Sequence, residues 1–165
     1  MATMQRISSN LWFDTQAEDA ANFYVGIFKN SSIIRTSYYG KEGQEIHKMP
    51  EGMVMTVEFE LEGQRFVGLN GGPVFQFNEA ISFIVNCDTQ DEVDYYWDKL
   101  SEGGDEKAQM CGWLKDKFGL SWQITPTILP EMLVDKNQEK AQRAMRAILQ
   151  MKKIDIKSLE QAFEG

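Results

Sequence analysis

The chain has 165 residues, the size of one domain or of two half-domains that share a core. Hydrophobic residues make up 42% of it and charged residues 25%, a composition that excludes intrinsic disorder. The net charge of −8, with 17 basic and 25 acidic residues, gives a field that repels the phosphates of nucleic acids and anionic lipids. We therefore expect no nucleic-acid partner.

Targeting and membrane signals are missing from the sequence. No apolar run approaches the roughly 18 residues needed to span a bilayer, and residues 1–10 lack a charged segment followed by an apolar one. We therefore expect a cytoplasmic protein with no membrane partner. The two cysteines, Cys87 and Cys111, match no zinc or redox spacing, so we expect reduced, buried thiols.

A short repeat indicates two related halves. The tripeptide Asp-Thr-Gln occurs at 14–16 and at 88–90, each time between an apolar strand-like run and a helical pattern. In each copy a Thr precedes a Glu by three residues, the pattern of a capping box at a helix start. The pairs are Thr15 with Glu18 and Thr89 with Glu92. The sequence thus predicts two helices that begin alike.

Strand patterns follow each predicted helix. Residues 53–61 alternate apolar and polar side chains, as a strand with two unlike faces does. Glu62-Gly63 predicts a two-residue turn into a partner strand at 64–70, because Gly adopts a left-handed backbone conformation at little cost. Further strands are predicted at 32–39, 107–115 and 120–125, with a turn at 116–119 between the last two.

The last forty residues have helical patterns. Pro130 can open a short helix, an amphipathic helix follows at about 141–149, and Asp155 can cap a last short helix. Residues 136–157 carry seven basic and two acidic side chains, which we interpret as a solvated helix face. We expect this tail to cover the sheet of its own chain or that of a partner.

The parity of the predicted strands divides their side chains between a helix-facing side and an opposite side. On the opposite side, three strands carry small neutral polar groups, among them Asn10, Ser82 and Gln123. Such a side is ordinary for a half-exposed sheet, but it also suits a mixed cleft in which these groups orient a ligand among aromatics. The aromatic candidates are Trp12, Phe75 and Trp113, although large aromatics in a small sheet also serve as core or dimer-interface anchors.

Three segments carry a family resemblance: LWFDTQAEDAANFYVGIF at 11–28, LNGGPVFQFNEAISFIVNCDTQDEVDYYWDKL at 69–100 and GWLKDKFGLSWQITPT at 112–127. They resemble the PhnB-like family of the glyoxalase/bleomycin-resistance/dioxygenase, or vicinal oxygen chelate, superfamily, over about residues 5–130. The resemblance implies an α+β fold of two βαβββ modules that form a curved mixed sheet with helices outside and a cleft inside, commonly as a homodimer.

The same resemblance sets the expected domain boundaries. A PhnB-like domain is expected over 1–130, with module one at about 5–72 and module two at about 78–128. Residues 131–165 are then expected to form a C-terminal helical extension.

Metal-using relatives hold a divalent ion through His or Glu side chains, and the resemblance places those positions near Ser8 or Asn10, at Ser82 and at Gln123. These neutral groups are weak donors, whereas Zn²⁺ or Fe²⁺ prefers imidazole, thiolate or carboxylate. We therefore expect neither a metal nor another cofactor. The one histidine, His47, lies in a polar loop, where it is either a solvated residue or a general base that reaches the cleft.

Many relatives carry the description 3-demethylubiquinone-9 3-methyltransferase, and methyl transfer typically needs a Gly-rich turn from a parallel strand into a helix. The Gly-rich run GLNGGP at 68–73 ends in proline and resembles a connector between modules. We therefore predict a protein that binds a small aromatic or otherwise apolar molecule in its cleft, with no catalytic residue assigned. The alternatives are a glyoxalase-type lyase, isomerase or dioxygenase, or the methyltransferase activity of the family description.

Overall fold

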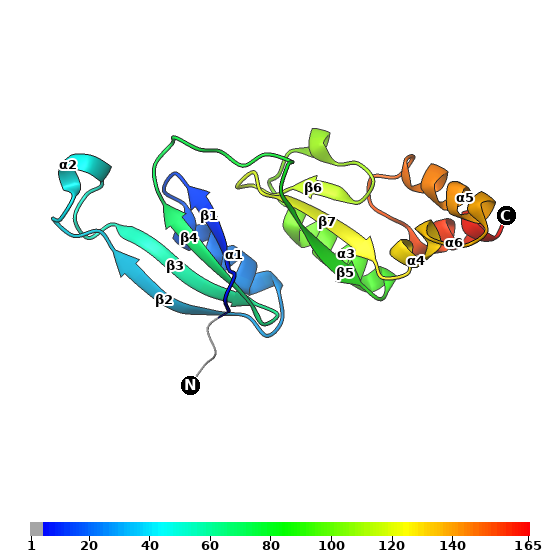
Figure 1. Ribbon diagram of the computed structural model, residues 1–165, viewed down its shortest axis with the longest axis horizontal. Helices are drawn as coiled ribbons and strands as arrows, with labels where there is room; N and C mark the ends of the chain where they lie inside the picture. The colour runs from blue at the N-terminus through cyan, green and yellow to red at the C-terminus, as the bar shows by residue number, and fades with distance from the viewer. Residues whose placement is uncertain (1–4) are drawn as a thin grey trace. The chain divides into compact units, whose positions relative to one another are not determined.

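The computed structural model describes residues 5–165 and divides into two compact units, Met1–Gln76 and Phe77–Gly165 (Figure 1). Each unit contains a small mixed β-sheet with a helix packed on it. Residues 1–4 lie outside the described residues, and with them the start of the domain predicted over 1–130. The further division of the chain at residue 131 stays a prediction.

The first unit has the predicted strand-helix-strand-strand-strand order. Its elements are β1 (Ser9–Phe13), α1 (Ala17–Ile27), β2 (Ser32–Tyr38), α2 (Gln44–His47), β3 (Val54–Leu61) and β4 (Gln64–Asn70). The sheet order is β1-β4-β3-β2, in which only β1 and β4 are parallel. Glu62 and Gly63, with φ of 47° and 81°, make the predicted hairpin turn between β3 and β4. The one-turn helix α2 was not predicted.

Helix α1 packs on one face of this sheet because small residues let it approach closely. Its alanines Ala17, Ala20 and Ala21 are fully buried, and Tyr24 stacks on Phe59 of β3 with ring centroids 6.1 Å apart. Alternate residues of β3 are buried, as the period of two predicted. We call the opposite side of this sheet the far face of the first unit.

The start of α1 differs from the prediction. Gln16 occupies the N-cap position without a side-chain hydrogen bond, so the capping box predicted at Thr15 is wrong. The Ala17 N–H instead donates to Oδ1 of Asn70, at the end of β4, over 2.8 Å. A side chain from a distant strand thus satisfies one of the orphan donors that a local cap would have bound.

The second unit has three strands, a central helix and three C-terminal helices. Its elements are β5 (Ser82–Cys87), α3 (Gln90–Ser101), the 3₁₀ turn Glu106–Ala108, β6 (Trp113–Lys115), β7 (Ser121–Pro126), α4 (Leu129–Leu133), α5 (Gln138–Ile148) and α6 (Ile156–Glu164). The sheet order is β5-β7-β6, with β5 parallel to β7 and β6 antiparallel to it. The predicted α+β class with a helical C-terminal part is confirmed.

The strand predicted at 107–115 is much shorter in the structure. Only 113–115 pair along β7, because the chain before them forms the 3₁₀ turn and then takes positive φ at Cys111 (53°) and Gly112 (83°). Residues with a left-handed backbone conformation do not continue a β-ladder. The pattern of apolar residues before Trp113 does not indicate that conformation, so the prediction extended the strand too far.

Helix α3 begins with the predicted cap and covers one face of the second sheet. Thr89 Oγ1 accepts the Glu92 N–H over 3.2 Å, and the Glu92 carboxylate accepts the Asp88 N–H over 2.7 Å. Val93 and Trp97 are buried on the sheet side of the helix, beside alternate buried residues of β5 and β7. We call the side of the sheet opposite α3 the far face of the second unit.

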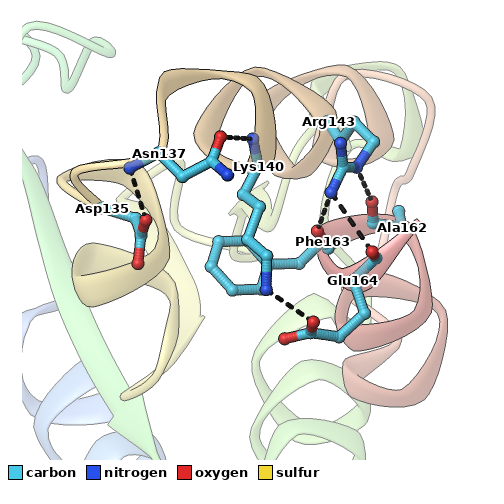
Figure 2. Close-up of polar contacts among 7 residues, drawn as sticks. All are labelled: Asp135, Asn137, Lys140, Arg143, Ala162, Phe163 and Glu164. Carbon is cyan, nitrogen blue, oxygen red and sulfur yellow. Dashed lines mark hydrogen bonds and ion pairs between the residues drawn. The ribbon is translucent and has the colours of Figure 1, made fainter.

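Helices α4 to α6 form a second small core within this unit. Its buried residues are Leu129, Ala144, Ile148, Ile154 and Leu159. Pro130 lies in the first turn of α4, and Asp155 caps α6 by accepting the Ser158 N–H over 2.6 Å, both as predicted. Arg143 of α5 donates to the last carbonyls of α6, so the two helices are tied together (Figure 2). The three tail helices therefore pack mainly on one another, and the expectation that the tail covers a sheet of its own chain or of a partner stays a prediction.

Within residues 5–165, no helix combines the length and the apolar character needed to cross a membrane.

Candidate functional site

Three of the predicted binding residues come together on the far face of the second unit. The pairing of β7 with its two neighbours places Ile84 opposite Gln123 on one side and Trp113 opposite Gln123 on the other. Gln123 Nε2 donates a hydrogen bond to Ser82 Oγ over 2.8 Å. Ile84 is 56% exposed, and the other three are partly buried. The prediction that Ser82 and Gln123 share one face is confirmed, and the strand register adds Ile84 and Trp113 on either side of the Gln123 amide.

Polar groups beside this cluster keep unused hydrogen-bonding capacity. Ser121, the strand partner of Ser82 and Lys115, is 1% exposed, and its Oγ has no partner among the described residues. Lys115 itself is paired with Glu79, whose carboxylate lies 2.5 Å from Nζ. A buried hydroxyl without a partner costs free energy, so a water or ligand atom that reached it would be bound favourably. Ser121 is not among the predicted binding residues, and the signal in the sequence that could have indicated it is its parity with Gln123.

The hairpin that aligns β6 with β7 is held by one buried carboxylate. Oδ1 of Asp116 accepts the N–H groups of Phe118 (2.8 Å) and Leu120 (3.0 Å), and Oδ2 accepts the indole N–H of Trp122 over 2.9 Å. Asp commonly opens a turn in this way. This turn lies in the 112–127 segment of the family resemblance, and it helps to fix the register of β6 and β7 across the candidate site.

In the first unit, Trp12 is enclosed by the Gly-rich run. Its indole N–H donates to the Gly72 carbonyl over 2.8 Å, and its ring meets that of Phe75 edge-on at 4.9 Å. A Cβ at Gly71 would lie 2.2 Å from the Trp12 ring, so only glycine fits there. Asn10 is exposed on the same side of β1 as Trp12. The structure brings Trp12 and Phe75 together and leaves Asn10 at the surface.

Charged residues on the far face of the first unit are paired with each other. Arg35 and Glu58 form an ion pair of 2.6 Å, and Arg65 lies 3.7 Å from Glu60. Ser8, Arg35, Glu58 and Arg65 line a cavity of about 110 Å³, which is too small for an aromatic ligand. Hydrogen bonding to Glu58 raises the pKa of Arg35. We see no acid–base pair in this arrangement.

The histidine is fully engaged by its own loop. Nδ1 of His47 accepts the Met49 N–H over 2.9 Å, and Nε2 therefore donates to the Glu42 carbonyl at 3.2 Å. The ring also packs on Tyr39, with centroids 4.6 Å apart. Because both ring nitrogens are hydrogen-bonded to backbone groups, we interpret His47 as a residue that stabilises the loop around α2 and not as a general base.

The residues present do not fit a divalent metal. Across residues 5–165, no three His, Cys, Asp or Glu side chains are grouped in a way that could hold an ion. At the positions implied by the superfamily, Asn10, Ser82 and Gln123 offer amide and hydroxyl oxygens, which do not offset the charge of a borderline metal.

The Cys87 thiol is not an activated nucleophile. Burial, helped by the nearby charges of Glu92 and Asp88, raises the pKa of Cys87 to about 12, which keeps it protonated at neutral pH. Cys111 packs against the core of the C-terminal helices. The candidate site is therefore a surface of neutral hydrogen-bonding groups and apolar side chains.

The element order, the two mixed sheets and the helix on each define an α+β protein of the glyoxalase, or vicinal oxygen chelate, fold. The chain belongs to the family described as 3-demethylubiquinone-9 3-methyltransferase, whose model matches residues 5–125. The PhnB protein from Bacillus cereus is 34% identical, covers 74% of this chain and 100% of its own, and superposes with a TM-score of 0.63.

Two more distant structures show the same fold. Protein PA1353 from Pseudomonas aeruginosa is 17% identical over 74% of this chain and 98% of its own, with a TM-score of 0.59. The fosfomycin resistance protein FosX from Listeria monocytogenes is 15% identical over 82% of this chain and 100% of its own, with a TM-score of 0.53. No curated protein matches the chain.

Proposed function

We propose that this protein binds a small, flat aromatic or otherwise apolar molecule that carries a hydrogen-bonding group, without a typical metal centre. The observation that carries the proposal is the position of Gln123 on the far face of the second unit: it lies between Ile84 and Trp113 of the neighbouring strands, and its Nε2 donates to Ser82 Oγ over 2.8 Å. A ring packed on the two apolar side chains would gain roughly 25 cal/mol per Å² of buried apolar area. The Gln123 amide and the Ser82 hydroxyl would then fix its orientation.

The residue chemistry favours binding over transformation. General acid–base catalysis needs a titratable group within hydrogen-bond reach of the ligand. On this face Glu79 is paired with Lys115, and in the first unit both nitrogens of His47 are bound to backbone groups. The proposal also includes Asn10, Trp12 and Phe75 of the first unit as binding residues, and a homodimer as the family resemblance implies.

The family description favours one second candidate, methyl transfer. The Gly-rich run does not support it, because Gly71 and Gly72 lie against the Trp12 ring and do not form the turn of a nucleotide-binding loop. If methyl transfer is the function, S-adenosylmethionine should bind the chain. Native mass spectrometry, described below, tests this.

The probe for the proposed site is 2-naphthol, with naphthalene as the matched ligand that lacks the hydroxyl. Binding to the full chain is followed by saturation-transfer NMR and by amide shifts of the labelled protein. We expect 2-naphthol to bind more tightly than naphthalene, and Gln123→Leu to weaken 2-naphthol about fivefold, the equivalent of one hydrogen bond. Asn86→Ala, at the exposed end of β5 on the same face, is the control and should change nothing. If neither compound binds saturably, or if Gln123→Leu binds like the wild type, the proposed site is wrong.

Native mass spectrometry tests the proposed homodimer, the absence of a metal and the methyl-transfer candidate in one experiment. A dimer mass supports the proposed homodimer, and a monomer contradicts it. One Zn²⁺, Mn²⁺, Fe²⁺ or Ni²⁺ bound specifically per subunit would contradict the metal-free site. An S-adenosylmethionine adduct would favour methyl transfer over simple binding.

A further inference from the structure

The C-terminal part of the chain contacts the residues that lead into the candidate site. Cys111 and Gly112, immediately before Trp113, donate their N–H groups to the carbonyls of Met151 and Lys152, both over 2.8 Å. The Gly112 carbonyl in turn accepts the Ile124 N–H over 2.8 Å, which extends the β6–β7 ladder by one bond. The segment after α5 is therefore bonded to the same short stretch of backbone that sets the position of Trp113.

This stretch is a tight turn that leaves two N–H groups for partners outside it. Cys111 and Gly112, with φ of 53° and 83°, are its central residues, and backbone hydrogen bonds between Met110 and Trp113 (3.1 and 2.8 Å) close it. The N–H groups of the two central residues take no part in that closure and are bound by the carbonyls of Met151 and Lys152. A non-glycine residue with positive φ is strained, so both the turn and the contacts around it hold Cys111 in this conformation. A Cβ at Gly112 would lie 2.9 Å from Cδ1 of Ile154, so the buried Ile154 side chain packs directly against this turn.

The other end of the contacting segment is anchored on α3. Gln90 Nε2 donates to the Ile154 carbonyl over 3.2 Å, and its Oε1 accepts the Ile156 N–H over 2.8 Å. Lys153 adds an ion pair of 2.7 Å to Asp94. Residues 151–156, which we call the brace, are thus tied on one side to the helix under the sheet and on the other to the start of β6.

We infer that the brace is a positioning element that holds Trp113 opposite Gln123 in the candidate site, an inference that rests on the proposed function. The family match ends at residue 125, and the Bacillus cereus protein covers 74% of this chain. Both comparisons therefore leave part of the chain unmatched. The brace lies beyond the family match, so this chain adds to the shared fold a support for one wall of its own site.

The test separates the position of Trp113 from overall stability. Tryptophan is replaced by 5-fluorotryptophan, and the fluorine NMR signal of Trp113, one of four, is assigned with Trp113→Phe. In Gln90→Met, which removes both hydrogen bonds to the brace, we expect the Trp113 signal to shift or broaden while that of Trp12 in the other unit does not. Amide exchange at Cys111 and Gly112 should accelerate at least tenfold, and the affinity for 2-naphthol should fall at least threefold.

A second variant and a control keep the inference open to refutation. Ile154→Val removes one methyl group from the side chain that packs on Gly112 and should change the Trp113 signal and the amide exchange in the same direction, but less. This variant tests the inference even if Gln90→Met does not fold. Arg143→Met loosens α6 on the other side of the tail and should leave the Trp113 signal unchanged. Unchanged Trp113 signal and amide exchange in both brace variants would refute the inference. Absence of 2-naphthol binding by the wild type would instead refute the proposed function, because the NMR readouts do not depend on the ligand.

Discussion

One buried side chain, Asn70, joins three parts of the first unit. Its Oδ1 accepts the Ala17 N–H, its Nδ2 donates to the Val54 carbonyl over 3.0 Å, and its own carbonyl accepts the Tyr39 hydroxyl over 2.6 Å. The residue is 1% exposed, so none of these groups could turn to water instead. A buried donor or acceptor that loses its partner keeps the full cost of desolvation.

Asn70→Ala should therefore lower the free energy of unfolding by about 2 to 3 kcal/mol, because the Ala17 N–H and the Val54 carbonyl lose their partners inside the protein. Urea unfolding followed by circular dichroism measures this change. Asn10→Ala removes the same side chain from an exposed position and should stay within about 0.5 kcal/mol of the wild type. Equal effects of the two substitutions would contradict the role given to Asn70.

The Cys87 thiol makes a prediction about reactivity. Its pKa is raised to about 12 by burial, so the reactive thiolate forms only in strongly alkaline solution. In a Cys111→Ser variant, whose one thiol is Cys87, Ellman's reagent should not react in mildly alkaline buffer and should react fully in guanidinium chloride. Rapid reaction of the folded variant would show that this thiol is either accessible or ionised.

At the scale of elements, a local sequence pattern holds where no distant side chain takes its place. Thr89 and Glu92 form the predicted cap, whereas Thr15 and Glu18, with the same spacing, do not, because α1 takes its cap from Asn70, 53 positions from Ala17. Parity placed Ser82 and Gln123 on one face because strand register preserves it. The shortening of β6 and the enclosure of Trp12 by glycines could not be predicted, because positive φ and tertiary contacts leave no periodic signal.

The contact between α5 and α6 gives a prediction at this scale (Figure 2). The Arg143 guanidinium donates to the carbonyls of Ala162 (3.0 Å), Phe163 (2.7 Å) and Glu164 (3.2 Å), which are free because the helix ends there. Arg143→Met should accelerate amide exchange in the last turn of α6 by about tenfold or more, with little change in global stability. Arg146→Met, an exposed neighbour on the same helix, is the control. Equal exchange in both variants would mean that the guanidinium does not hold α6.

At the scale of the whole molecule, residues 126–165 lie beyond the family match, and Asp94 and Asp155 take part in the contacts that hold this helical tail. Hydrogen bonding to Lys153, and then to Gln90, lowers the pKa of Asp94. Hydrogen bonding to Ser158 lowers the pKa of Asp155, which caps α6. A pKa that is lower in the folded than in the unfolded state means stabilisation that is complete above the unfolded value and is lost as the pH falls through the folded one.

Acid should therefore loosen the tail selectively. The ordinary pKa of an aspartate is about 3.9, so the attachment is intact at neutral pH and weakens only below about pH 4. Amide exchange recorded through that range should show residues 151–165 opening at a higher pH than the sheet of the first unit. Asp94→Asn removes the ion pair to Lys153, so its tail should already exchange faster at neutral pH and change less with acid, while Asp19→Asn on α1 should behave like the wild type. If the tail and the first unit opened together at one pH in all three proteins, the carboxylates would not control its attachment, and apolar packing around Ile154 and Leu159 would have to hold the tail alone.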